Sequence, residues 1–97
     1  MFARITSMDI KVERIDEAVK IYEDSVIPAA KLQKGFLGAY FLSDPKTGKG
    51  ISLTLWRSEA DAIANERNRY YQEQLAKFIP FFQSQPIREG FDVNVKA

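Results

Sequence analysis

Two residue types are missing from the chain, which has no cysteine and no histidine in its 97 residues. Without cysteine it forms no disulfide, offers no thiolate nucleophile and holds no iron–sulfur cluster. Without histidine it builds no Ser–His–Asp triad, no histidine-ligated haem site and no ordinary zinc site. The acidic residues show none of the spacing that a hard cation needs. We therefore expect no metal and no other cofactor, and the lack of cysteine is typical of a cytoplasmic protein.

A dominant charge and a long apolar run are lacking as well. Fourteen basic residues stand against thirteen acidic ones, a formal net charge of +1, so the chain shows no electrostatic footprint for a polyanion. No apolar run approaches the ~20 residues that span a bilayer, and the start of the chain has no signal-peptide pattern. Hydrophobic residues make up 45% of the chain, which predicts one globular domain over residues 1–97. Neither nucleic acid nor a membrane is an expected partner.

The first third of the chain predicts a strand followed by a helix. Residues 3–12 alternate between two sides, which is the period of a strand. From Ile15 onward the apolar residues recur at helical spacing. We expect this helix to extend through Lys34, to stop at Gly35, and to kink or restart at Pro28.

The rest of the chain predicts a hairpin, a second helix and a last strand. Residues 36–43 and 50–57 have strand character and are joined by the turn sequence DPKTGK. Ser58 begins an S-x-x-D capping box that opens a helix, which should end before Pro80. A final strand is expected at roughly residues 88–96. The apolar stripe of the second helix is expected to comprise Ala60, Ile63, Ala64, Arg67, Tyr71, Leu75 and Phe78.

The order strand–helix–strand–strand–helix–strand predicts an α+β fold, a ferredoxin-like split βαβ sandwich with a four-stranded antiparallel sheet. Two helices cover one face of such a sheet. The third strand is nevertheless apolar on both sides, with Leu53 and Leu55 on one side and Trp56 on the other. A sheet with one solvated face alternates more cleanly. We therefore expect a second copy of the chain to cover the remaining face in a two-fold homodimer.

The stretch KGFLGAYF at 34–41 begins like the signature strand of RNA-recognition modules, which share this fold. Leu37 stands where a small residue is required, and Gly38 stands where a base-stacking aromatic should be. The segment also follows the first helix, so it begins the second strand and not the third.

The sequence TGKGIS at 47–52 is followed by a strand, so it is a hairpin loop and not a phosphate-binding loop.

The middle of the chain carries a resemblance to a known family. Residues 35–60, GFLGAYFLSDPKTGKGISLTLWRSEA, combine a glycine–aromatic entry to a strand, an Asp-x-x-Thr-Gly hairpin, a strand ending in Trp56 and a capped helix. In these features the chain resembles the antibiotic biosynthesis monooxygenase family of dimeric α+β barrels. The resemblance implies two sheets packed face to face across a dimer axis, and a pocket between helices and sheet in each subunit.

The resemblance also implies candidate activities. Relatives include cofactor-independent oxygenases that convert phenolic or hydroquinone substrates to quinones, and haem-degrading oxygenases. The haem-degrading members need a histidine that this chain lacks. Quinone-forming members place an asparagine four residues before the strand-end tryptophan, and this chain has Ser52 there.

Trp56 and Arg67 are the candidate catalytic residues. Trp56 could stack on a planar substrate with its indole N–H aimed at a substrate oxygen, or it could fill a gap under a helix as ordinary core. Arg67 falls on the expected apolar stripe. It could hold a phenolate or carboxylate over the pocket, or it could lay its stem on the sheet with its head in water.

Three residues are candidates for substrate binding, namely Tyr22, Tyr40 and Ser52, whose hydroxyls could line the same cavity. Each tyrosine alone could equally be a core residue whose hydroxyl reaches the surface. The acidic pair of Asp16 and Glu17 suits the dipole of a helix N-terminus better than acid–base chemistry. Three further side chains fall off the expected stripe and are predicted to be solvated, namely Asn65, Arg69 and Tyr70.

Two functions follow as hypotheses. The first is a cytoplasmic, homodimeric, cofactor-independent monooxygenase-like protein that acts on a small aromatic substrate of phenolic or hydroquinone type. The second is a non-catalytic dimeric binding or structural homologue of the same fold, because one architecture hosts many unrelated functions.

Overall fold

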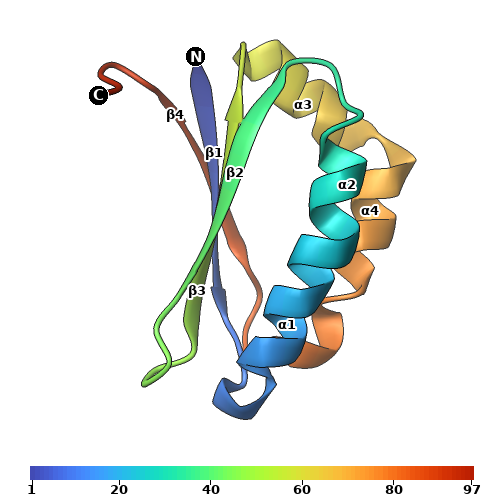
Figure 1. Cartoon of the computed structure of the whole chain (residues 1–97), viewed down its shortest axis with the longest axis vertical. Helices are drawn as coiled ribbons and strands as arrows, with labels where there is room; N and C mark the ends of the chain where they lie inside the picture. The colour runs from blue at the N-terminus through green and yellow to red at the C-terminus, as the bar shows by residue number, and fades with distance from the viewer.

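A computed structural model describes residues 1–97 as two layers, a four-stranded sheet and a layer of helices on one of its faces (Figure 1). None of the helices is both long and apolar enough to cross a membrane. Short 3-10 turns at Val12–Arg14 and Ile79–Phe81 join the main elements. The strands and helices in chain order are β1 (Phe2–Asp9), α1 (Ile15–Ile21), α2 (Ile27–Ala30), β2 (Phe36–Ser43), β3 (Lys49–Trp56), α3 (Glu59–Arg67), α4 (Arg69–Ala76) and β4 (Ile87–Asp92).

The sheet has the order β2-β3-β1-β4 with every neighbouring pair antiparallel, as predicted for a ferredoxin-like split βαβ fold. β1 pairs with β3 so that Thr6 lies opposite Ser52 and Arg4 opposite Thr54. The side chains of these four residues therefore share the face that the helices cover. Strand lengths differ from expectation, because β1 ends at Asp9 and β4 ends well before residue 96.

The first helical segment contains one wide turn just before its proline. A π-helical turn at Tyr22–Val26 lies between α1 and α2, and the N–H of Ile27 donates to the carbonyl of Tyr22, five residues earlier. Val26 and Ile27 keep right-handed helical dihedrals, so the helix does not restart at Pro28, and the irregularity expected there takes the form of this wide turn. The helix ends at Ala30 and not at Lys34, which corrects the expected boundary.

The second helical segment is two helices and not one. Ser58 caps α3, and its hydroxyl oxygen accepts from the N–H of Asp61 at 3.2 Å, as the capping box predicts. Asn68 then adopts an extended backbone, φ −76° and ψ 139°, which separates α3 from α4. Because the break resets the helical phase, one apolar stripe cannot continue through both helices. Ala60, expected on the stripe, is exposed, and Ala62 is fully buried instead.

The buried residues form two separate clusters between the layers. The larger cluster lies around Ile10, Tyr22, Phe78 and Phe81. The smaller one contains Phe2, Trp56 and Ala62. An interior divided in this way leaves space between its two parts, and the cavity described below occupies that space.

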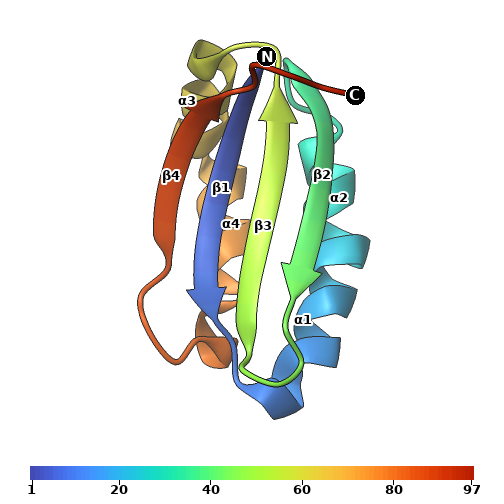
Figure 2. The ribbon, with the colours of Figure 1, turned by 90° about the vertical axis from the view of Figure 1, so that its left-hand side faces the viewer.

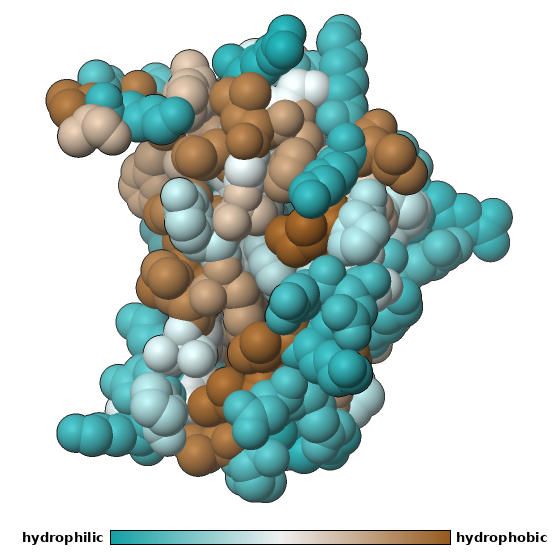
Figure 3. Space-filling model, in the orientation of Figure 1, coloured by the Kyte–Doolittle hydropathy of each residue, from teal (hydrophilic) through white to brown (hydrophobic).

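The other face of the sheet has no cover from the chain itself. Figure 2 looks onto this bare face, with all four strands in front of the helices. In Figure 3 hydrophobic side chains line the side of the molecule that the sheet forms. The predicted excess of apolar surface is confirmed by the exposed large side chains of this face, which are Leu37, Tyr40, Leu42, Ile87 and Phe91.

Candidate functional site

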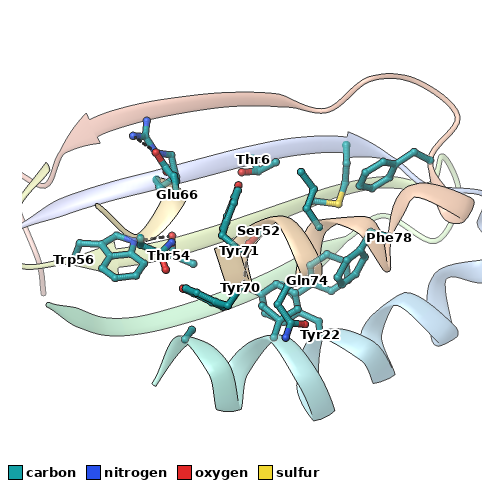
Figure 4. Close-up of a pocket in the computed structure, with 18 residues that line it drawn as sticks. Thr6, Tyr22, Ser52, Thr54, Trp56, Glu66, Tyr70, Tyr71, Gln74 and Phe78 are labelled. Atoms are coloured by element: carbon teal, nitrogen blue, oxygen red, sulfur yellow. Dashed lines mark hydrogen bonds and ion pairs between the residues drawn. The ribbon is translucent and has the colours of Figure 1, made fainter. Parts of the chain in front are cut away.

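A cavity of about 100 Å³ lies between the inner face of the sheet and the helices. Figure 4 shows it in close-up, with Trp56 at one end and Phe78 at the other. The lining comes from strands β1, β2 and β3, from the π-helical turn and from helices α2, α3 and α4, with Phe78 and Phe82 beyond α4. Members of both core clusters border it, so the cavity is the gap between them.

The floor of the cavity is a group of hydroxyl side chains on the central strands. Thr6 on β1 faces Ser52 on β3, and Thr54 follows two residues further along β3. Side chains two positions apart on a strand point to the same face, so Ser52 and Thr54 lie on one face of β3. The hydroxyl of Ser52 lies 2.9 Å from that of Tyr22, which reaches down from the π-helical turn.

Aromatic rings form one wall. Tyr22 stacks on Phe41, with ring centroids 4.8 Å apart, and meets the edge of Phe78 at 6.5 Å. Burial raises the pKa of the Tyr22 hydroxyl, and the hydrogen bond with Ser52 partly opposes that rise. Tyr22 therefore remains protonated at neutral pH and presents an aromatic edge with one neutral polar group.

A second aromatic wall comes from α4, where Tyr70 and Tyr71 project toward the sheet (Figure 4). Burial, with a smaller contribution from Tyr71, raises the pKa of Tyr70 to about 12. The hydroxyl of Tyr71 accepts a hydrogen bond from Arg88 of β4 at 3.4 Å. Tyr70 is thus neutral at physiological pH and can donate a hydrogen bond, but it is not a base.

The charged side chains of the cavity neutralise each other. Arg4 on β1 donates two hydrogen bonds to the carboxylate of Glu66 on α3, at 2.5 and 3.1 Å. Both side chains are largely buried, 16% and 9% exposed. The lining contains no other charged residue, and no group of three His, Cys, Asp or Glu side chains could hold a metal ion. The cavity is therefore mostly apolar, with hydroxyl and amide groups but no net charge.

Trp56 lies at one end of the cavity but is only 2% exposed. Its indole N–H donates to the hydroxyl oxygen of Thr54 at 3.0 Å, and its ring meets Phe36 edge-on. The N–H is therefore used within the chain and is not aimed at a substrate. Thr54 accepts that bond, so its own hydroxyl proton remains able to donate into the cavity.

Two of the five predicted site residues lie away from the cavity. Arg67 is exposed and does not line it, because α3 presents a different face to the sheet from the one that the expected stripe assumed. Tyr40 is 61% exposed on the bare face of the sheet, opposite Leu53. The structure brings the other three together, namely Tyr22, Ser52 and Trp56.

Asn65 and Tyr70 were expected to be solvated, and both line the cavity instead. Arg69 is exposed as expected, with 92% of its side chain accessible. Residues 62, 65 and 66 share one face of α3, because they are three or four positions apart. This face, and not the expected stripe, turns toward the sheet, since Ala62 is fully buried. Nothing in the sequence marks the Arg4–Glu66 pair, whose members are 62 positions apart.

No protein-family profile and no curated protein sequence matches the chain. Solved structures do match its fold. A protein from Bordetella bronchiseptica, described as a candidate antibiotic biosynthesis monooxygenase, has a TM-score of 0.84 at 11% identity, over 97% of each chain. An antibiotic biosynthesis monooxygenase has a TM-score of 0.78 at 16% identity, over 96% of this chain and 98% of that one. A protein of unknown function from Nitrosomonas europaea has a TM-score of 0.77 at 16% identity, over 99% and 91%. At such identities the likeness establishes the fold.

Proposed function

We propose that this chain is a member of the antibiotic biosynthesis monooxygenase family and a cofactor-independent, monooxygenase-like protein that acts on a small phenolic or hydroquinone-type substrate in the cavity between helices and sheet. The observation that carries the proposal is the pairing of a hydroxyl floor with aromatic walls. Thr6, Ser52 and Thr54 supply hydrogen bonds, and Tyr22 and Tyr70 supply ring surfaces. A planar ring with oxygen substituents on one edge complements both surfaces.

Such substrates need little chemistry from the protein. A hydroquinone takes one oxygen atom of O₂ at a ring C–H and becomes a hydroxyquinone, and the second oxygen atom leaves as water. An anthrone-type CH₂ group takes one oxygen atom as a carbonyl, and the second oxygen leaves as water. The chain's own contribution is to orient the ring, to exclude water and to hydrogen-bond the substrate oxygens.

The size of the cavity restricts the substrate. At about 100 Å³ it is somewhat smaller than a cavity of about 150 Å³ that accepts a benzene ring, and far below the roughly 300 Å³ at which drug-sized pockets begin. A single ring with its substituents toward the cavity mouth therefore fits better than a fused system of three rings. For a fused ring system α4 would have to move away from the sheet.

The roles proposed for individual residues follow from where they lie. Tyr22 and Ser52 bind substrate oxygen atoms through their paired hydroxyls, and Trp56 closes one end of the cavity while orienting Thr54. Arg67 and Tyr40 have no part in this proposal, because neither side chain reaches the cavity.

Oxygen uptake tests the proposal. Hydroquinones, anthrones and flavonoids are added to the purified protein, and the uptake above the uncatalysed rate is measured. Ser52→Ala and Tyr22→Phe each remove one cavity hydroxyl and should lower kcat/KM by about tenfold. Arg67→Ala is the matched control and should leave the rate unchanged. Loss of activity in Arg67→Ala, with full activity in Ser52→Ala and Tyr22→Phe, would place the chemistry elsewhere.

A second function, a non-catalytic binding protein of the same fold, is favoured by one specific observation. The only cation that lines the cavity, Arg4, is already neutralised by Glu66, so no free positive charge faces an anion that develops during oxidation. This alternative predicts that phenolic ligands bind without any oxygen uptake above background.

The proposed assembly is a homodimer formed through the bare face of the sheet. On that face, large apolar side chains are exposed along both edge strands, for example Leu37 and Tyr40 on β2 and Phe91 on β4. Contiguous apolar surface of this kind is uncommon on monomers and is typical of an interface. A second copy offers the same surface and covers it symmetrically.

A further inference from the structure

We propose that Asn65 makes the cavity selective for neutral aromatic ligands that carry a hydrogen-bond donor, an O–H or N–H group, over ionised ligands and over analogues without a donor. This inference rests on the proposed binding of an aromatic ring in the cavity, and it names the chemical form of the ligand that binds there.

Asn65 carries an unused hydrogen-bond acceptor. Its side-chain oxygen is buried and has no hydrogen-bond partner, and it is the only buried side-chain oxygen or nitrogen in the chain without one. Buried polar atoms are almost always partnered, because an unmet acceptor loses its hydration and gains nothing in return. The residue lines the cavity while its oxygen is closed to water, so a ligand there supplies the missing donor once the side-chain amide turns toward the cavity.

The ion pair and the indole N–H at this end of the cavity are already engaged, and Thr54, whose hydroxyl proton is free, makes no hydrogen bond to Asn65. The next residue, Glu66, accepts both hydrogen bonds of Arg4. Trp56 donates to Thr54 at the same end of the cavity. Asn65 lies near the end of α3. Its backbone oxygen accepts a hydrogen bond from the N–H of Asn68, the residue at which the helix ends, at 3.1 Å. The backbone of Asn65 is thus fixed while its side-chain oxygen stays free.

The charge balance of the cavity favours a neutral ligand. Arg4 and Glu66 cancel, and the remaining lining residues carry no charge. A phenolate or carboxylate in the cavity would lose hydration without meeting a free cation, and it would place a negative charge close to the partially negative oxygen of Asn65. A protonated phenol avoids both penalties and donates to Asn65.

The test compares ligands of one ring size that differ in donors. Binding of hydroquinone, 4-methoxyphenol, 1,4-dimethoxybenzene and 4-hydroxybenzoate is measured by ¹H–¹⁵N NMR titration of the full chain at neutral pH without oxygen. For the unmodified protein we expect hydroquinone and 4-methoxyphenol to bind at least about tenfold more tightly than 1,4-dimethoxybenzene, since a site built to bond a hydroxyl rejects the analogue without it. We expect 4-hydroxybenzoate to bind more weakly than the two phenols.

Asn65→Leu, which keeps the size of the side chain and removes the acceptor, should abolish the preference. Binding of 1,4-dimethoxybenzene should persist while binding of hydroquinone falls about tenfold. The same variant should unfold at an equal or higher temperature than the unmodified protein, because it removes a buried unpartnered atom. Gln72→Leu is the matched control, a solvent-facing amide on α4 that should change neither measurement. If Asn65→Leu does not fold, Asn65→Ala serves for the same ligand comparison.

The outcomes separate this inference from the function on which it rests. If none of the rings perturbs the cavity residues, the proposed function fails and the inference fails with it. If all the rings bind equally well, or the preference survives Asn65→Leu, aromatic binding stands and the role of Asn65 is wrong. A clear loss of stability in both Asn65→Leu and Asn65→Ala would equally overturn it, because Asn65 would then have a structural partner.

Discussion

Arg4 and Glu66 form a two-point ion pair between the sheet and the second helical segment, with Nε to Oε2 at 2.5 Å and Nη2 to Oε1 at 3.1 Å. The two side chains are 16% and 9% exposed. The pair fixes α3 over β1 at the end of the cavity that Trp56 closes, and it removes net charge from the cavity lining.

Removing one member of this pair should be more damaging than removing both. Glu66→Leu leaves the Arg4 charge largely buried without a partner and should lower the free energy of unfolding by about 2–3 kcal/mol. The double variant Arg4→Met/Glu66→Leu should recover most of that loss. Urea unfolding of the two single variants and the double variant measures the coupling. If the losses of unfolding free energy in the two single variants add up to the loss in the double variant, the two side chains act independently.

Stability should fall at high pH because of Tyr70. An unfolded tyrosine titrates near pH 10, whereas burial raises the pKa of Tyr70 to about 12 in the folded chain. Between these values the folded state keeps a proton that the unfolded state has lost, so stability is complete below pH 10 and decreases as the pH rises toward 12. With allowance for the part of the ring that contacts water, this contribution is about 1 kcal/mol.

Urea unfolding at about pH 9 and about pH 11.5 measures this dependence. The unmodified protein should lose about 1 kcal/mol more over that range than Tyr70→Phe, which has no proton to lose. Equal losses in the two proteins would mean that Tyr70 titrates normally in the folded state.

Gly35 should tolerate no side chain. Its φ is +82°, and a Cβ built there would collide with the side chain of Asp61 at the start of α3. Gly35→Ala should therefore cost about 2 kcal/mol or more in unfolding free energy. Gly38→Ala is the matched control on the same strand entry, because nothing lies within 4 Å of its added Cβ. Thermal unfolding compares the two variants, and similar melting temperatures would contradict the steric argument.

The bare face of the sheet should hold two copies of the chain together. We expect the unmodified protein to sediment as a dimer at micromolar concentration, and Tyr40→Lys/Leu42→Lys to sediment as a folded monomer. These side chains are 61% and 49% exposed in the single chain, so the substitutions should leave the monomer fold intact. Leu32→Lys adds a charge at a more exposed site outside the sheet and should remain dimeric. A monomeric unmodified protein would refute the proposed assembly.

Local patterns predicted the elements of this fold well. The alternation in β1 and the cap at Ser58 both depend on residues close in sequence, and the structure contains each of them. The expected helix stop at Gly35 is wrong, because the helix ends at Ala30, although Gly35 does take a positive φ. The apolar bare face could also be predicted, because alternation along β3 assigns Leu53 to the side opposite Trp56.

The candidate site was less predictable because it depends on helix phase and on distant contacts. The expected stripe treated residues 58–78 as one helix, so it pointed Arg67 inward and Asn65 outward, and the break at Asn68 invalidates that assumption. The Arg4–Glu66 pair joins residues that only the tertiary fold brings together. Sequence therefore identified the tyrosine, serine and tryptophan of the cavity but not its charge balance.

The wide turn at Tyr22–Val26 amounts to one extra residue within an otherwise regular rod. Deleting a single residue there would let ordinary spacing resume, and the residues downstream would keep their direction, because the wide turn uses one more residue for nearly the same rotation. Val26 and Ala30, which border the cavity from that rod, would then still face the strands. The surplus residue therefore bulges locally and leaves the shape of the chamber unchanged.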